Sequence, residues 1–494
     1  MIPLQGTASV KPAPLGLSRG VPPARPASAP VKPEILNPGN PVAFYAALAL
    51  IFLRFSLLHE TVAFYTGTNT YILYLFAIPA LLGVVLTGGV QRTLAARPAK
   101  YWLAFVFWLF LTVPFSFWRG ESASYALNYL RTDLPMLFVM AGLALTWKEF
   151  KAILYTISGA GIFSIFTGLF LSKEYGSDRL GLASGTFANP NDYAGHLLIL
   201  LPLLLFLVLN PPQILLGWVF RVGGAVAILV GLYVTLMSAS RGALVALVVG
   251  SVFVILKSRA SVRIAALVLL PILAFALIRV LPEQTLARLQ NISISDQPNP
   301  EDGIADPAST EAEGSARARR FLLQESIRVT LEHPLFGVGP GQFAAVEGRA
   351  TGWHSTHNSF TQISSECGIP ALVFFLAGIF SAFRLLLRVW KQARYRPDMQ
   401  EVVTVCYCLS LSFVMFLTAI FFLNFGYVFY LPAFTGLFIA LWRVAGQDLA
   451  AFPALTSARV PSARPSAAKA TLTAIPAPAP LSPPRKTFRF NRYR

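Results

Sequence analysis

Long apolar runs alternate with short polar segments over most of the chain, from about residue 42 to residue 444. Twelve of these runs are long enough to cross about 30 Å of hydrocarbon as α-helices. They lie near residues 42–58, 71–87, 101–117, 126–146, 150–171, 193–209, 219–237, 242–257, 263–281, 369–388, 402–423 and 426–444. The fourth run is the weakest because Arg131, Asp133 and Pro135 interrupt it. The pattern predicts an all-α, polytopic membrane protein with about twelve transmembrane helices, and an even number places both termini on one side.

The two ends of the chain differ from this pattern. Residues 1–41 and 445–494 are rich in Pro and Ala, carry scattered basic residues and contain few bulky apolar ones. Such segments bury too little apolar surface to offset the entropy that ordering costs, so we expect both to be disordered. Between the two tails, the chain is expected to form nine spans over residues 42–281, a long loop at 282–368 and three further spans over 369–444.

Composition supports the membrane class. Hydrophobic residues make up 55% of the 494, charged residues only 13%, and the mean hydropathy is +0.61. A soluble protein of this length needs more charge to cover its surface. The net charge of +18 would suit nucleic acid, but most Lys and Arg residues fall on one side when both tails are placed in the cytoplasm. This distribution follows the positive-inside rule. We therefore expect no nucleic-acid partner, cytoplasmic tails and an outer loop at 282–368.

The outer loop is the longest polar interval, and long loops are commonly functional or disordered. Residues 291–316 are acidic and contain Pro and Gly, which predicts a mobile segment. Residues 317–333 predict an amphipathic helix that Pro334 ends. The apolar positions at helical spacing are Phe321, Leu322, Ile327 and Leu331.

The first candidate for chemistry is Arg241, which lies between Ser240 and Gly242 in the connection from the seventh to the eighth span. Small neighbours allow a ligand to approach closely, and the planar donors of a guanidinium suit phosphate oxygens. The alternative is an arginine that ends a helix by reaching the lipid headgroups. The residues alone support both about equally.

A second candidate is the basic group Arg317, Arg319 and Arg320 at the expected start of the loop helix. A helix N-terminus carries partial positive charge, so arginines placed there invite an anionic partner. The alternative is a solvated charge run that balances the acidic segment before it.

His354 and His357 form a third candidate, in the segment WHSTHNSF. They are three residues apart, but no carboxylate or third ligand lies at metal spacing, so we expect no metal site. A histidine with a pKa near about 6.5 can take a proton from a sugar hydroxyl at neutral pH. The alternative is a hydrogen-bonded loop histidine. The cysteines also lack metal-site partners and are expected to be ordinary apolar residues; they are Cys367, Cys406 and Cys408.

Two other segments predict local structure. The segment PLFGVGPGQF lacks the strand and helix of a nucleotide loop, so it predicts a tight turn. Asn189, Asn191, Asp192 and His196 enter the sixth span, where Asn-Pro-Asn is typical of a turn or helix cap.

Three patches carry a resemblance to a known family: GTFANPNDYAGHLLILLPLLL, SASRGALVAL, and HPLFGVGPGQF followed by HNSFTQISSECGIPAL. In order and spacing they resemble the O-antigen ligase and polymerase superfamily, integral-membrane glycosyltransferases that act on lipid-linked glycans. The likeness covers roughly residues 180–380. It implies an all-α, GT-C-like membrane fold with a large extracytoplasmic loop that contains short helices.

The resemblance also implies roles for individual residues. Arg241 and either Arg319 or Arg320 would bind the pyrophosphate of the lipid carrier, and the run of arginines leaves the register open. His357 would be the catalytic base. The supporting residues would be Asn358, Ser240, Gly242, Asn191 and Glu366. No cofactor and no metal is implied.

These observations predict a ligase-like enzyme of the bacterial inner membrane, with its site facing the periplasm. It would move a glycan from polyprenyl (undecaprenyl) pyrophosphate to a hydroxyl of a glycan, lipid A-core or other acceptor, in lipopolysaccharide or surface polysaccharide biosynthesis. An O-antigen or exopolysaccharide polymerase and a protein O-oligosaccharyltransferase of the same superfamily stay open. A transporter or flippase is the alternative from another class. It is less favoured because the two halves show no repeat and mid-span ionisable residues are few.

Overall fold

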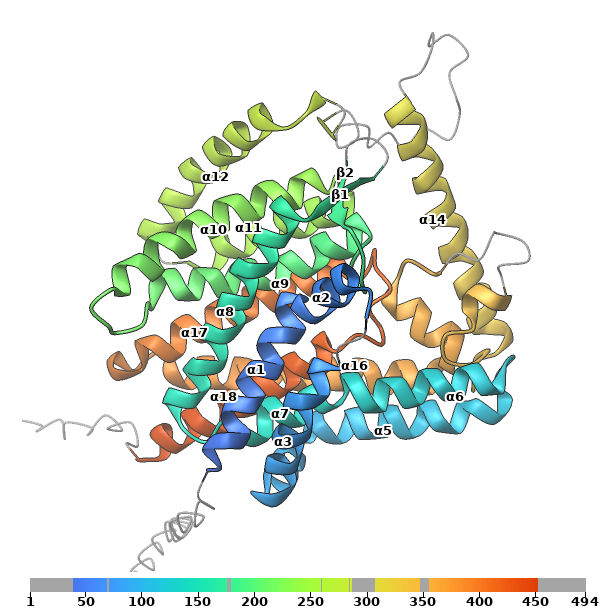
Figure 1. Ribbon diagram of the computed structural model, residues 1–494, viewed down its shortest axis with the longest axis horizontal. Coiled ribbons are helices and arrows are strands. Elements are labelled where there is room, and N and C mark those ends of the chain that lie inside the picture. The colour runs from blue at the N-terminus through green and yellow to red at the C-terminus, as the bar shows by residue number, and fades with distance from the viewer. Residues whose placement is uncertain are drawn as a thin grey trace, which may run out of the picture. The chain divides into compact units, whose positions relative to one another are not determined.

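The computed structural model describes residues 39–68, 71–175, 179–258, 260–283, 285–286, 307–346 and 355–451. These residues are mostly helical (Figure 1). The helices are α1 Pro41–Ser56, α2 Leu58–Thr66, α3 Ile72–Leu86, α4 Gly89–Leu94, α5 Arg97–Thr112, α6 Arg119–Asn128, α7 Pro135–Leu143, α8 Trp147–Phe170, α9 Pro190–Leu209, α10 Gly217–Met237, α11 Arg241–Lys257, α12 Ala260–Val280, α14 Pro307–Glu332, α16 Ser359–Ala393, α17 Gln400–Ala419 and α18 Tyr430–Ala451. Short 3₁₀ turns lie at Val113–Phe115 and Pro397–Met399, and a π turn lies at Tyr129–Asp133.

Seven helices in the described part of the chain are long and apolar enough to cross a membrane. They are Arg97–Phe115, Trp147–Phe170, Pro190–Leu209, Gly217–Met237, Ala260–Val280, Ser359–Ala393 and Pro397–Ala419. Helices α1 and α2 add an eighth if they count as one span, bent by 68°. A multi-pass membrane protein is therefore confirmed, and the expected number of twelve spans is not. Two of the expected spans correspond to α3 and α11, whose 15 and 17 residues are too few to be counted among the seven.

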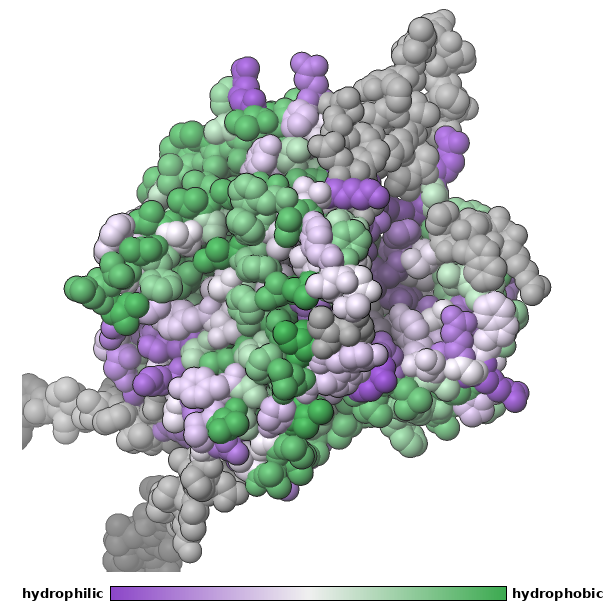
Figure 2. Space-filling model, in the orientation of Figure 1, coloured by the Kyte–Doolittle hydropathy of each residue, from purple (hydrophilic) through white to green (hydrophobic). Residues whose placement is uncertain are grey.

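Helix α12 shows why this fold needs lipid. It has 21 residues, most of them apolar, and none of its residues is buried. Apolar side chains cover the surface around its position in the space-filling view (Figure 2). A bare apolar surface of this kind is stable against hydrocarbon but not against water.

The fourth expected span, residues 126–146, is not one helix. Its polar residues fall in the π turn Tyr129–Asp133, which separates α6 from α7. Asp133 is buried and accepts a hydrogen bond of 2.8 Å from the guanidinium of Arg54 on α1. This ion pair explains how two mid-span charges that the apolar pattern could not accommodate are held inside the protein.

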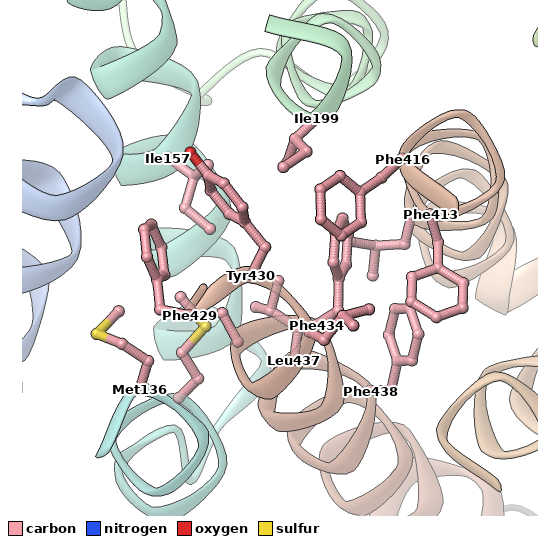
Figure 3. Close-up of a cluster of buried hydrophobic side chains, with 14 of the residues drawn as sticks. Met136, Ile157, Ile199, Phe413, Phe416, Phe429, Tyr430, Phe434, Leu437 and Phe438 are labelled. Atoms are coloured by element: carbon pink, nitrogen blue, oxygen red, sulfur yellow. The ribbon is translucent and has the colours of Figure 1, made fainter. Parts of the chain in front are cut away.

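Helix α18 lies in the core, against α7 and α16. Its aromatic side chains interlock with those of α17, where Phe413 packs at 5.2 Å from both Phe434 and Phe438 between ring centroids (Figure 3). Phe416 lies edge-on to Tyr430 at 5.4 Å. Because lipid tails are as apolar as these rings, close packing rather than exclusion from water must hold such helices together.

Helix α14 begins at Pro307, ten residues before the expected start. Residues 307–316 are therefore helical, contrary to the expected mobile segment, while 287–306 lie outside the described residues. The three arginines consequently lie within the helix, and the argument from the helix dipole is wrong.

The buried face of α14 also differs from the expected one. Leu322 and Val329 are buried with Ser326 between them, and Thr330 bonds Ser364 of α16 at 2.9 Å between hydroxyl oxygens. Among the four expected apolar positions, only Leu322 is buried; Phe321, Ile327 and Leu331 are exposed.

A small hairpin is one departure from the all-α expectation. Strands β1, Ser172–Tyr175, and β2, Arg179–Leu182, pair antiparallel between α8 and α9. Ser172 lies opposite Leu182. The hairpin brings Arg179 beside the N-terminus of α9, which matters for the site described next.

Candidate active site

A cavity of about 300 Å³ brings together residues that lie far apart in the sequence. It is lined from α9, α11, α14, the segment before α16 and the connection from α17 to α18. Figure 2 shows a hollow of hydrophilic residues between the positions of α2 and α14. Seven of the nine expected site residues line the cavity: Asn191, Arg241, Gly242, Arg319, Arg320, His357 and Asn358. Ser240 and Glu366 are not among the lining residues.

Arg241 is the first residue of α11, and a sharp corner positions it. Ala239 adopts a left-handed backbone with φ 48°, and Ser240 caps the helix by accepting from the amide of Ala243 at 3.4 Å. A Cβ on Gly242 would lie 2.9 Å from the Cβ of Phe422, so only glycine allows α11 to approach that connection this closely. The N-terminus of α11 and the guanidinium of Arg241 thus present positive charge to the same cavity.

Arg319 and Arg320 come from α14. Arg319 is half-buried and also interacts electrostatically with Asp192, whereas Arg320 is exposed. Together with Arg241 they give the lining a formal charge of three, and none of its described residues is acidic. Guanidinium groups bind phosphate oxygens through paired donors. The cavity therefore suits a multiply charged anion such as a pyrophosphate.

His357 occupies a strained position beside the start of α16. Its φ is 52°, and the next residue, Asn358, caps α16 by accepting from the amides of Phe360 at 2.9 Å and Thr361 at 3.1 Å. A non-glycine residue in this conformation must be held there by its surroundings. The imidazole is thus directed into the cavity by a backbone that its neighbours fix.

Those neighbours belong to the connection between α17 and α18. The amide of Ser359 donates to the carbonyl of Ile420 at 3.0 Å, and the hydroxyl of Ser359 donates to the carbonyl of Leu423 at 2.7 Å. Thr356 donates from its hydroxyl to Oδ1 of Asn424 at 2.8 Å. The residues on both sides of His357 are therefore tied to the same loop that supplies Phe421 and Phe422 to the cavity.

Glu366 lies apart from the cavity and supports the Gly-rich turn. Its Oε2 accepts from the amide of Gly341 at 2.9 Å, and its backbone carbonyl accepts from the amide of Gly339 at 2.7 Å. Gly337, Gly339 and Gly341 all have positive φ. The expected tight turn is confirmed, and it packs on the kink of α16 at Gly368, where φ is 80°.

Two residues of this neighbourhood were missed from the sequence. Arg179 donates to the carbonyl of Ser238 at 3.1 Å and to Oδ1 of Asn191 at 3.0 Å, so it ties the Arg241 corner to α9. Asn424 braces the His357 segment. Neither residue belongs to a recognisable motif, because its role exists only once distant segments meet.

Metal binding at His354 is not addressed by the structure, since His354 lies outside the described residues. Within those residues, no group of three His, Cys, Asp or Glu side chains is placed to hold a metal ion.

No curated protein matches the chain. Residues 225–376 match the family model described as O-antigen ligase. This range runs from α10 to the middle of α16 and contains Arg241, both cavity arginines of α14 and His357. Members of the family are glycosyltransferase-like membrane enzymes, for which a lipid-linked glycan donor is implied. The match confirms the resemblance for this part of the chain: residues 225–376 are similar to the O-antigen ligase family.

Proposed function

We propose that the protein transfers a glycan from polyprenyl pyrophosphate to an acceptor hydroxyl at the outer face of the cytoplasmic membrane, as an O-antigen ligase does. The observation that carries this proposal is a single cavity lined by three arginines and His357. The arginines supply the charge that a pyrophosphate requires, and the histidine supplies a base within the same space.

In the proposed reaction, Arg241 and the arginines of α14 bind the pyrophosphate. The acceptor oxygen attacks the anomeric carbon of the glycan, a new glycosidic bond forms, and the bond from that carbon to the phosphate oxygen breaks. The electron pair of the broken bond leaves on polyprenyl pyrophosphate, whose added charge the guanidinium groups stabilise. His357 takes the proton of the hydroxyl. The arginines neutralise the leaving group, so we expect no metal requirement.

The distribution of basic residues supports the proposed outer location. The cavity is built from the segments that connect the spans on the side opposite the Lys- and Arg-rich connections. By the positive-inside rule this side faces away from the cytoplasm. A glycan donor carried across the membrane on its polyprenyl chain would reach the site there.

The test measures glycan transfer by the full chain in lipid nanodiscs, from a synthetic undecaprenyl-pyrophosphate oligosaccharide to membrane-extracted lipopolysaccharide core. We expect His357→Ala to lower kcat by about 10²–10⁴-fold, the usual contribution of a general base. Arg241→Ala should lower kcat/KM by about 10²–10³-fold, as loss of a charge-stabilising donor does.

Arg317→Ala is the matched control, because Arg317 is an exposed arginine of α14 that does not line the cavity. It should retain normal turnover. Normal turnover by both His357→Ala and Arg241→Ala would contradict the mechanism. A product that carries one added glycan identifies a ligase, whereas a ladder of repeats on the donor lipid identifies a polymerase.

A further inference from the structure

A second cavity, of about 290 Å³, lies next to the first and has a different chemistry. Its walls come from the ends of α1 and α2, from α6 and the π turn, and from the connections that precede α9 and α18. The hydrophilic hollow of Figure 2 lies between α2 and α14. Residues of α14 line the first cavity and residues of α2 line the second.

The second cavity has one cation and two carboxylates in its walls, and each is held by a partner there. Arg54 is paired with Asp133 at 2.8 Å. Glu60 accepts from the amide of Thr186 at 2.8 Å and from its hydroxyl at 2.6 Å. One paired cation and two carboxylates do not suit a phosphate, in contrast with the three arginines of the first cavity.

The remaining groups suit sugar hydroxyls. Tyr129 is 1% exposed and its hydroxyl finds no hydrogen-bond partner among the described residues, nor does Nε of Arg54. Buried polar atoms of this kind call for an external partner. Asn128 adds an amide, and the rings of Tyr427 and Phe429 offer faces to the C–H surface of a sugar.

A hydrogen bond joins the walls of the two cavities. Thr356 lines the first cavity, Asn424 lines the second, and their side chains bond at 2.8 Å. Thr356 directly precedes His357. A hydroxyl held in the second cavity beside Asn424 is therefore one side chain away from the segment that carries the proposed base.

A third cavity, of about 340 Å³, adjoins the second and shares Arg54, His59, Glu60 and Thr132 with it as wall residues. Its other walls are mostly apolar and come from α1, α3 and the start of α7. Leu50, Leu73, Ala77, Leu81 and Met136 line it. A polar chamber that lies beside an apolar one matches a molecule with a polar head and a lipid tail.

We propose that the second cavity binds the acceptor, and that this acceptor is a lipid-anchored glycan whose sugar head lies in the second cavity and whose apolar part lies in the third. The assignment of the occupant as an acceptor rests on the proposed function. The donor would then reach His357 through the arginine-lined cavity, and the acceptor would reach the segment that carries His357 from the second cavity.

The test measures protection of a cysteine from a maleimide, which does not depend on turnover. Asn128→Cys places the thiol at the second cavity, and Gly120→Cys places one on the same helix with nothing within 4 Å. The native cysteines are buried and should not react. The probe is dodecyl maltoside, added to nanodiscs below its micellar concentration. Maltose, which has the sugar without the tail, and dodecylphosphocholine, which has the tail without the sugar, are tested in parallel.

We expect dodecyl maltoside to slow labelling of Asn128→Cys at least fivefold and to leave Gly120→Cys unchanged. Adding Tyr129→Phe should remove most of this protection, whereas Tyr155→Phe, which removes a hydroxyl that bonds Asn210 and lines neither cavity, should not. Equal protection by dodecylphosphocholine would show a site for any lipid, and equal protection by maltose would show that no lipid anchor is recognised. Either result, or no protection, overturns the proposal.

Failure of this inference can be told from failure of the proposed function. If the wild type transfers glycan but dodecyl maltoside gives no protection, only the acceptor site is wrong. If dodecyl maltoside protects but no lipid-pyrophosphate donor is used, the sugar site stands and the transferase proposal falls.

Discussion

Arg179 donates from its guanidinium to Oδ1 of Asn191 at 3.0 Å and, through Nε, to the carbonyl of Ser238 at 3.1 Å. Arg179 is buried on β2, while Asn191 lies in the first turn of α9 and Ser238 ends α10. One side chain thus links three segments, and the corner that it holds leads directly to Arg241. Arg179 is a positioning residue for the arginine that we propose binds pyrophosphate.

Removal of this link should disturb Arg241 without removing its charge. We expect Arg179→Ala to lower kcat by up to about 10²-fold, because displacement of a catalytic group by about 1 Å has an effect of that size. Asn191→Ala should have a smaller effect, and the double variant should be no worse than Arg179→Ala, since neighbours in one network are not additive. Strict additivity would show that the two residues act separately.

The two arginines of α14 should differ in their effect on donor binding. Arg319 is half-buried and Arg320 is exposed, and both line the cavity. A charge shielded from solvent interacts more strongly with a bound anion than a solvated one. We expect Arg319→Ala to raise the KM for the lipid-pyrophosphate donor at least about 10-fold, equivalent to about 1.4 kcal/mol, and Arg320→Ala to raise it less. The reverse order would assign the donor contact to Arg320.

Gly242 should tolerate no side chain. Its Cβ would meet the Cβ of Phe422 at 2.9 Å and the Cγ at 3.0 Å, and overpacking of this kind costs about 1–3 kcal/mol. Gly242→Ala should therefore move the start of α11 and lower both thermal stability and transfer. Gly223→Ala on α10 is the control, because nothing lies within 4 Å of that position. It should leave stability unchanged or raise it by up to about 1 kcal/mol.

Most residues of the candidate site could be named from the sequence, because local patterns and the resemblance to a known family pointed to the same positions. Arg241, His357 and Asn191 come from different elements, yet each lies in a local pattern that indicates a corner, a base or a cap, and all three line one cavity. The sequence could not show Arg179 or Asn424 in the same way. Arginine and asparagine are ordinary in loops, and their hydrogen bonds join segments that only the fold brings together.

The errors in the fold arise because an apolar pattern does not show what each side chain contacts. In a membrane protein an apolar residue is as stable against lipid as in the core, so periodicity does not distinguish the two. Periodicity also did not identify the buried face of α14, since Phe321, Ile327 and Leu331 are exposed and Val329 is buried. The span count rested on hydropathy alone. Hydropathy does not show that Arg54 and Asp133 form an ion pair, and this pair allows a charged π turn to interrupt an apolar run.

The orientation in the membrane is a prediction that two cysteine variants can check. Lys148 and Lys151 lie near the start of α8, and Lys151 pairs with Glu401 near the start of α17 at 3.0 Å, so these two helix ends lie on the same side. By the positive-inside rule this side faces the cytoplasm, and α6, which borders the second cavity, faces outward. In spheroplasts we expect a membrane-impermeant maleimide to label Glu121→Cys, an exposed position on α6, but not Lys148→Cys, which is equally exposed. In inverted vesicles the pattern should reverse. Labelling of Lys148→Cys in intact spheroplasts would place both proposed substrate cavities in the cytoplasm, where a donor already moved to the outer leaflet could not reach them.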